Sequence, residues 1–188
     1  MKRISILLLI SIVVSCSDSR KNSSSLPGRL GNPEMSLIND PRAIPAVTKV
    51  MSDFGLDSLA PDPPISIEAT QKEKVDYMTS LESKYEEVFE SLFSELSEVN
   101  GVERFTKTID GIDGNKIKLY IHKPEKQKSN IPGILHIHGG GMSILKAKNP
   151  NYIRWRDDLA STGLIVVGVE FRNVAGELGS HPFPAGLN

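Results

Sequence analysis

Three consecutive glycines, Gly139–Gly141, restrict the fold of this 188-residue chain more than any other feature. They follow His138 and the mostly apolar run Ile134–Ile137. A chain gives up the backbone entropy of adjacent glycines only where side chains would be in the way, as where a backbone approaches a ligand or turns sharply. A strand that ends in such a loop presents bare N–H groups, which can hold an oxygen that gains negative charge in a transition state. The pattern therefore predicts an oxyanion hole after a strand.

The segments on either side of the glycines predict a βαβ unit. Ile134–Ile137 and Leu164–Val169 are nearly all apolar, which is typical of strands buried on both faces of a parallel sheet. Between them, Asn149-Pro150 has the residues of a helix start and Gly163 those of a helix end. A strand, a helix and a second strand in this order predict parallel pairing with a crossover.

An antiparallel hairpin is predicted upstream of this unit. Apolar and polar residues alternate strictly over residues 116–122, and residues 102–109 form a matching run. Asp110-Gly111 and Asp113-Gly114 supply turn residues between the two runs. The fold class is therefore α/β, with an antiparallel hairpin before the parallel part of the sheet.

Two helices are predicted before the hairpin. The first is expected from Asn39-Asp40-Pro41 to Gly55, because an N-cap residue precedes proline and glycine closes the apolar pattern. The second is expected from Ser66 to about Val99, where apolar residues recur at helical spacing along one face. This face predicts a helix that packs on the body of its own domain.

The N-terminus has the pattern of a bacterial lipoprotein signal. Lys2 and Arg3 precede the apolar stretch Ile4–Val14, which is too short to span a bilayer, and Ser15 and Cys16 follow. Val13–Cys16 resembles a lipobox, which implies a lipid on Cys16, a membrane anchor and an extracytoplasmic location. The alternative is an ordinary cleaved signal of a secreted or periplasmic protein. Residues 16–38, which begin with a polar serine-rich run, are predicted to be a tether.

Composition and spacing exclude several classes of function. The 22 basic and 23 acidic residues give no field that favours nucleic acid, and a single cysteine excludes an intrachain disulfide. The glycines lack the G-x-x-x-x-G-K-[ST] spacing of a phosphate loop. His136 and His138 share one strand face as two metal ligands would, but no Asp or His follows to complete a site. We expect His136 to pack near the sheet with a backbone hydrogen bond, and we expect no metal or organic cofactor.

Three motifs resemble the hormone-sensitive-lipase-like esterases and lipases of the α/β-hydrolase fold. They are the His138–Gly141 loop after a strand, Phe171-Arg172-Asn173, and the H-P-F-P-A run at residues 181–185. Relatives have an aromatic residue after the third glycine, where this chain has Met142, and a shorter link than residues 173–180. The longer link indicates a subfamily.

The resemblance implies specific roles for the loop residues. The N–H groups of Gly140 and Gly141 would hold the substrate oxyanion, while His138 and Gly139 would shape the turn. The resemblance places His181 in a structural run and not as the catalytic histidine. It also implies that the helices of residues 39–99 form a cap over an active site, an alternative to packing on the body alone.

The implied activity is carboxylic-ester hydrolysis by a Ser-His-Asp/Glu triad acting on a small ester substrate. No G-x-S-x-G occurs in the 188 residues, and relatives carry it shortly after the H-P-F-P-A run. We therefore expect an incomplete α/β-hydrolase fold. Its expected parts are a signal peptide (1–15), a tether (16–38), a helical cap region (39–99) and the first part of the core (100–188), which ends before the nucleophile.

Two expectations follow from the missing nucleophile. The 188 residues alone should hydrolyse no ester, and the strand at 164–169 should have an open apolar edge that favours aggregation. The alternative function is a surface lipoprotein that keeps the hydrolase scaffold and only binds a ligand or a partner. The sequence does not determine the oligomeric state.

Overall fold

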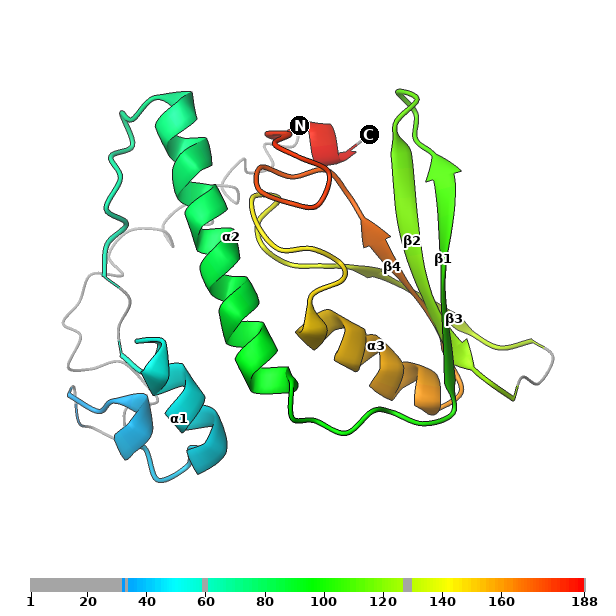
Figure 1. Ribbon diagram of the computed structural model, residues 1–188, viewed down its shortest axis with the longest axis horizontal. Coiled ribbons are helices and arrows are strands. Elements are labelled where there is room, and N and C mark those ends of the chain that lie inside the picture. Colours follow the sequence, from blue (N-terminus) through cyan, green and yellow to red (C-terminus); the bar gives the residue numbers. More distant parts are fainter. Residues whose placement is uncertain (1–31, 33, 59–60, 127–129, 188) are drawn as a thin grey trace, which may run out of the picture. The chain divides into compact units, whose positions relative to one another are not determined.

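A computed structural model describes residues 32, 34–58, 61–126 and 130–187. The chain divides after Ser58 into two compact units. The predicted signal peptide, Cys16 and most of the predicted tether lie outside the described residues. The elements in chain order (Figure 1) are η2 (Leu37–Asn39), α1 (Pro45–Asp53), α2 (Gln71–Phe93), β1 (Val102–Asp110), β2 (Lys116–Pro124), β3 (Gly133–Ile137), α3 (Pro150–Ser161), β4 (Ile165–Glu170) and η3 (Ala185–Leu187).

The helix of the first unit begins later than the sequence predicts. Asp40 accepts the backbone N–H of Arg42 at 2.9 Å and pairs with its guanidinium, but these bonds close a turn, in which the N–H of Ala43 donates to the carbonyl oxygen of Asp40. The chain turns at this point, and α1 starts at Pro45. The predicted end is confirmed, since α1 stops at Asp53 and Gly55 follows in the left-handed region with φ 68°.

Helix α2 is present but shorter at both ends than its apolar pattern. Thr70 caps it by a reciprocal pair of hydrogen bonds, in which Thr70 Oγ1 accepts the N–H of Glu73 and the Glu73 carboxylate accepts the N–H of Thr70. This capping box fixes the first turn at Gln71. The helix ends at Phe93, so the apolar residues up to Val99 belong to the connection to β1.

The four strands of the sheet have the order β1-β2-β4-β3. The predicted hairpin is confirmed, because β1 and β2 pair antiparallel from Val102 opposite Pro124 to Asp110 opposite Lys116. The predicted βαβ unit is also confirmed, because β3 and β4 pair in parallel on either side of α3 in the chain. Strands β2 and β4 pair antiparallel and join the two parts.

The predicted open edge at residues 164–169 is wrong. Strand β4 is an inner strand with β2 on one side and β3 on the other, so β3 forms the edge. The prediction placed the missing next strand beside β4, whereas the crossover through α3 returns the chain to the gap between β2 and β3, where β4 pairs with both. The predicted burial of β3 on both faces is also wrong, because exposure alternates along the strand and Leu135 and Ile137, on one face, are each 65% exposed.

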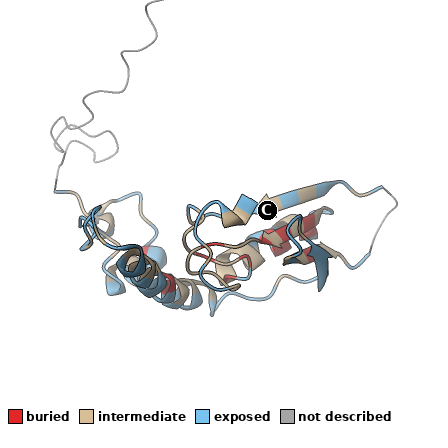
Figure 2. Cartoon of the chain, turned by 90° about the horizontal axis from the view of Figure 1, so that it is seen from above, coloured by how far each residue is buried: buried red, intermediate tan, exposed pale blue. Residues whose placement is uncertain are grey.

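Helix α3 packs on one face of the sheet through buried charged residues. Asp157 accepts two hydrogen bonds from the Arg104 guanidinium, at 2.8 and 2.6 Å, and its Oδ1 lies 2.7 Å from Nδ1 of the buried His122. The neighbouring Arg156 is fully buried, and a Cβ on Gly168 of β4 would lie only 2.7 Å from its guanidinium. The buried residues, red in Figure 2, lie mainly on β2, β4, α3 and the segment that connects β3 to α3.

Within the parts of the chain that the structure describes, no helix has the length and apolar character needed to cross a membrane.

Candidate active site

The glycine loop leaves the carboxyl end of β3 and leads to α3. Gly140 and Gly141 have φ values of 105° and 62°, and Leu145 also has a positive φ, of 71°. A Cβ on Gly140 would lie 2.1 Å from the carbonyl oxygen of Ile144, so only glycine fits there. A Cβ on Gly141 would meet no atom within 4 Å, so this position requires glycine only for its backbone conformation.

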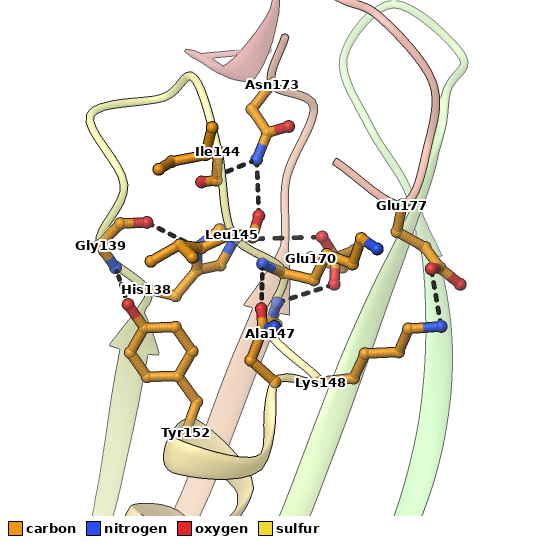
Figure 3. Close-up of polar contacts among 12 residues, drawn as sticks. His138, Gly139, Ile144, Leu145, Ala147, Lys148, Tyr152, Glu170, Asn173 and Glu177 are labelled. Atoms are coloured by element: carbon orange, nitrogen blue, oxygen red, sulfur yellow. Dashed lines mark hydrogen bonds and ion pairs between the residues drawn. The ribbon is translucent and has the colours of Figure 1, made fainter. Parts of the chain in front are cut away.

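The N–H groups of the three glycines differ in their partners. The N–H of Gly139 donates to the hydroxyl oxygen of Tyr152 on α3, at 3.1 Å (Figure 3). The carbonyl oxygen of Gly140 accepts the N–H groups of Ser143 and Ile144, which closes a tight turn. Neither the N–H of Gly140 nor that of Gly141 has an acceptor among the described residues. Two adjacent donors are therefore available to bind an oxygen of an external ligand.

His138 packs at the base of the loop. Its side chain is buried, its ring stacks on Phe171 with centroids 4.1 Å apart, and its Nδ1 lies 2.8 Å from the carbonyl oxygen of Gly139. A carbonyl oxygen only accepts hydrogen bonds, so Nδ1 carries the proton. Nε2 is then an acceptor, and it is buried with no hydrogen-bond partner. Burial lowers the pKa of His138, which favours this neutral form.

Glu170, the last residue of β4, lies beside His138 in the same buried region (Figure 3). Its Oε2 accepts the N–H of Ala147 at 2.9 Å, and its Oε1 lies 4.0 Å from Nε2 of His138 without a hydrogen-bond partner. Burial raises the pKa of Glu170 to about 7. A buried carboxyl group whose pKa is about 7 thus faces a buried imidazole under the glycine loop.

Leu145, at the end of the turn, is held by two side chains from other elements. Its N–H donates to the carboxylate of Glu82 on α2. Its carbonyl oxygen accepts a hydrogen bond from the amide nitrogen of Asn173 at 2.8 Å. Both side chains are almost fully buried.

Sequence reasoning missed the side chains that support the loop, namely Glu82, Tyr152, Glu170 and Asn173. The one usable signal is Glu170, a charged residue that ends an otherwise apolar strand. The other three residues lie in segments whose sequence patterns do not indicate a contact with the glycine loop.

His136 does not make the backbone hydrogen bond that the sequence suggested. Its Nδ1 lies 3.3 Å from Nη1 of Arg156, and its ring packs on Trp155 with centroids 4.7 Å apart. Burial, followed by the charge of Arg156, lowers the pKa of His136 to about 4. The polar contact of its Nδ1 is thus with a cation. In the described part of the chain, no cluster of three or more His, Cys, Asp or Glu residues is placed to hold a metal ion.

The two downstream motifs lie beside the glycine loop, and His181 forms hydrogen bonds within its own segment. Nε2 of His181 lies 3.0 Å from the carbonyl oxygen of Leu178, and the N–H of His181 donates to the carbonyl oxygen of Asn173. Arg172 pairs with Asp113 in the hairpin turn. The long link of residues 173–180 reaches the loop, because the N–H of Ala175 donates to the carbonyl oxygen of Ser143 at 2.9 Å.

Solved structures of esterases are similar to this chain. Brefeldin A esterase, described as a bacterial homologue of human hormone-sensitive lipase, is 37% identical with a TM-score of 0.73, and the match covers 86% of this chain and 45% of that protein. Esterase Est22 is 28% identical with a TM-score of 0.63, over 81% of this chain and 45% of that protein. No protein-family model and no curated protein sequence matches the chain. The chain thus spans about 45% of the length of these two esterases.

A bacterial heroin esterase is 24% identical with a TM-score of 0.51, over 61% of this chain and 34% of that protein. At this identity the likeness concerns the fold alone.

Proposed function

We propose that this chain, which belongs to the hormone-sensitive-lipase-like family of the α/β-hydrolase fold, supplies the oxyanion loop of a carboxylic-ester hydrolase. The observation that carries the proposal is the difference in hydrogen-bond partners among the N–H groups of the three glycines. The N–H of Gly139 is taken by Tyr152, whereas those of Gly140 and Gly141 have no acceptor among the described residues. Two adjacent free donors after a strand suit an oxygen that becomes negatively charged.

In the proposed reaction, a serine attacks the ester carbonyl carbon while a histidine accepts its proton and an acid orients the histidine. The carbonyl oxygen becomes the oxyanion, which the N–H groups of Gly140 and Gly141 stabilise. The ester C–O bond then breaks, and the alcohol leaves with the proton that the histidine held. A water molecule, which gives its proton to the histidine, next attacks the acyl-serine through a second oxyanion and releases the acid and the serine. The residue after the serine would supply a further N–H donor. Loss of one donor of this kind costs about 10²–10³ in rate.

The nucleophile has to come from outside the given residues, because they contain no G-x-S-x-G. The proposed role of this chain is therefore to hold the substrate oxygen. The esterase names of the similar structures support an ester as substrate class. The chemistry proposed needs no metal or organic cofactor.

The test uses the full-length protein, meaning the product of the complete coding sequence that contains this chain. We expect a G-x-S-x-G motif after Asn188 and hydrolysis of p-nitrophenyl butyrate that is lost when the motif serine is replaced by alanine. Residues 16–188 alone should give no turnover above that of the serine variant. A natural stop codon after Asn188, or a folded full-length protein without esterase activity, would instead support the non-catalytic lipoprotein that binds a ligand or partner.

For the N-terminus we propose lipid attachment at Cys16, supported by the lipobox-like Val13–Cys16 after a basic and apolar leader. The expressed protein should then incorporate labelled palmitate and fractionate with membranes, and the Cys16→Ser variant should do neither. A soluble extracytoplasmic product without label would favour the ordinary cleaved signal.

A further inference from the structure

One face of α2 reaches the glycine loop through a buried carboxylate. Glu82 lies in the middle of the helix and is only 4% exposed. A buried charge is costly unless it is paired or hydrogen-bonded, so its partners indicate why it is kept there. One carboxylate oxygen accepts the N–H of Leu145, and the other lies 3.7 Å from Nζ of Lys146.

A second acidic residue one turn later points to the same segment. Glu86 accepts a hydrogen bond from Nζ of Lys146, but the Glu86 side chain is 41% exposed. The Lys146 side chain is 16% exposed, so this pair is half-buried, but it acts on the end of a long side chain and not on the backbone of the loop. The buried contact of Glu82 with a backbone N–H is therefore the one that can fix the loop.

Leu145 is where the turn that begins at Gly140 ends. The carbonyl oxygen of Gly140 accepts the N–H of Ile144, and Ile144 is joined directly to Leu145. Leu145 has a positive φ, a conformation that a non-glycine residue keeps only when its surroundings enforce it. Glu82 on its N–H and Asn173 on its carbonyl oxygen provide that enforcement.

The turn has no room to absorb a shift of this residue. A Cβ on Gly140 would lie 2.1 Å from the carbonyl oxygen of Ile144, so these two backbone segments are already in contact. A movement of Leu145 must therefore change the direction of the Gly140 and Gly141 N–H groups.

We propose that Glu82 is a positioning residue of the oxyanion loop, through which α2 fixes the direction of the Gly140 and Gly141 N–H groups. The catalytic half of this inference rests on the proposed ester hydrolysis, but the structural half does not. It gives α2 a defined role in the site: the helix sets the geometry of the donors through one hydrogen bond.

The test compares Glu82→Ala and Glu82→Gln with the same two changes at Glu87, an exposed residue of the same helix. The glutamine oxygen can still accept the N–H of Leu145, whereas alanine cannot. In the full-length protein, Glu82→Ala should speed hydrogen exchange of the Leu145 amide and shift the amide resonances of Gly140 and Gly141. It should also lower kcat for p-nitrophenyl butyrate about 10- to 100-fold with little change in KM, as expected for misplaced catalytic groups.

Glu82→Gln should restore most of the kcat and the slow exchange, and both Glu87 variants should match the wild type. If Glu82→Ala does not fold, Glu82→Asp replaces it, because aspartate keeps the charge but is one methylene too short to reach Leu145. Unchanged exchange of Leu145 in Glu82→Ala, or in Glu82→Asp where that variant replaces it, would overturn the proposal. Equal losses at Glu87, or faster exchange with an unchanged kcat, would overturn it as well.

A wild-type protein without esterase activity would contradict the proposed function and leave the Glu82 inference to the exchange rates and the glycine resonances. In that case, Gly140 and Gly141 resonances that do not respond to Glu82→Ala would overturn it.

Discussion

The hydroxyl oxygen of Tyr152 lies 3.1 Å from the backbone nitrogen of Gly139 and accepts its N–H. This contact ties the first glycine of the loop to α3, whereas the N–H groups of the next two glycines have no acceptor among the described residues. The Tyr152 ring also packs against His136 and His138, with centroids 5.2 and 5.8 Å away. Helix α3 thus fixes both the strand end and the start of the loop.

The Tyr152→Phe variant separates the contribution of the hydroxyl group from that of the ring packing. The phenylalanine ring can keep the packing, but the N–H of Gly139 loses its acceptor. We expect a loss of about 1 kcal/mol in the free energy of unfolding, the usual net value of such a hydrogen bond, and a several-fold decrease in kcat. Urea unfolding and ester hydrolysis by the full-length protein measure the two effects. A variant equal to the wild type in both would show that Tyr152 does not hold the loop.

Alanine at the second and third glycines should have unequal effects. Gly140→Ala places a Cβ 2.1 Å from the Ile144 carbonyl oxygen, so the turn must open, and we expect a rate loss of about 10²-fold or more. Gly141→Ala meets no atom within 4 Å and costs only the left-handed conformation, about 1 kcal/mol. Values of kcat/KM for the two variants test the order, and a larger loss at Gly141 would contradict the role of the Gly140 turn.

The stability of the protein should depend on pH through Glu170. Burial raises the pKa of Glu170 from 4.5 to about 7 in the folded state. The stabilisation that this gives is complete below about pH 4.5 and is lost as the pH rises through 7, because the unfolded state ionises first. Glu170→Gln removes the ionisation and keeps an acceptor for Ala147, so at pH 8 it should raise the free energy of unfolding, on the order of 1–3 kcal/mol.

Glu177 provides the matched control for this measurement. Its hydrogen bond to Lys148 lowers its pKa, so its contribution is present above the ordinary pKa of a glutamate and is lost as the pH falls. Glu177→Gln should therefore destabilise the protein slightly at pH 8, opposite in sign to Glu170→Gln. Chemical unfolding at pH 5 to 8 measures both, and a Glu170→Gln variant that is no more stable than the wild type at pH 8 would refute the assignment.

Two adjacent aspartates of α3 should differ strongly in importance. Asp157 and its partner His122 are buried, whereas Arg104 is 44% exposed, so Asp157→Ala leaves one buried imidazole without its acceptor and should cost about 1–3 kcal/mol. Asp158 pairs with Arg154 on the exposed side of the helix, and Asp158→Ala should cost less than about 0.5 kcal/mol. Urea unfolding of the two variants gives the comparison, and similar losses would show that Asp157 does not join α3 to the sheet.

Local patterns predict the elements of this fold but not their lateral order. The alternation in residues 116–122 and the apolar runs around α3 predict the hairpin and the parallel pair, which are confirmed. The position of β4 between β2 and β3 was missed, because periodicity shows which face of a strand is buried and not which strand lies beside it. The start of α2 could have been predicted from Thr70 and Glu73, a capping-box pair, but the apolar pattern extends beyond it on the N-terminal side.

In the candidate site, too, the sequence predicts some residues and not others. Gly140 and Gly141 are identified by a contiguous motif, because a tight turn with free N–H groups needs glycines next to one another. Their supports come from segments far away in the chain, such as Glu82 on α2 and Asn173 after β4. Such contacts depend on tertiary packing, which one sequence does not reveal. The loop could be predicted, and the side chains that fix it could not.

The most direct test of the central claim is a crystal structure of the full-length protein inactivated by a p-nitrophenyl alkylphosphonate, whose phosphoryl oxygen occupies the place of the ester oxyanion. We predict that this oxygen lies about 2.7–3.1 Å from the backbone nitrogens of both Gly140 and Gly141. The N–H of Gly139 should remain on the Tyr152 hydroxyl. An oxygen held by Gly139, or by neither Gly140 nor Gly141, would contradict the assignment of the oxyanion hole.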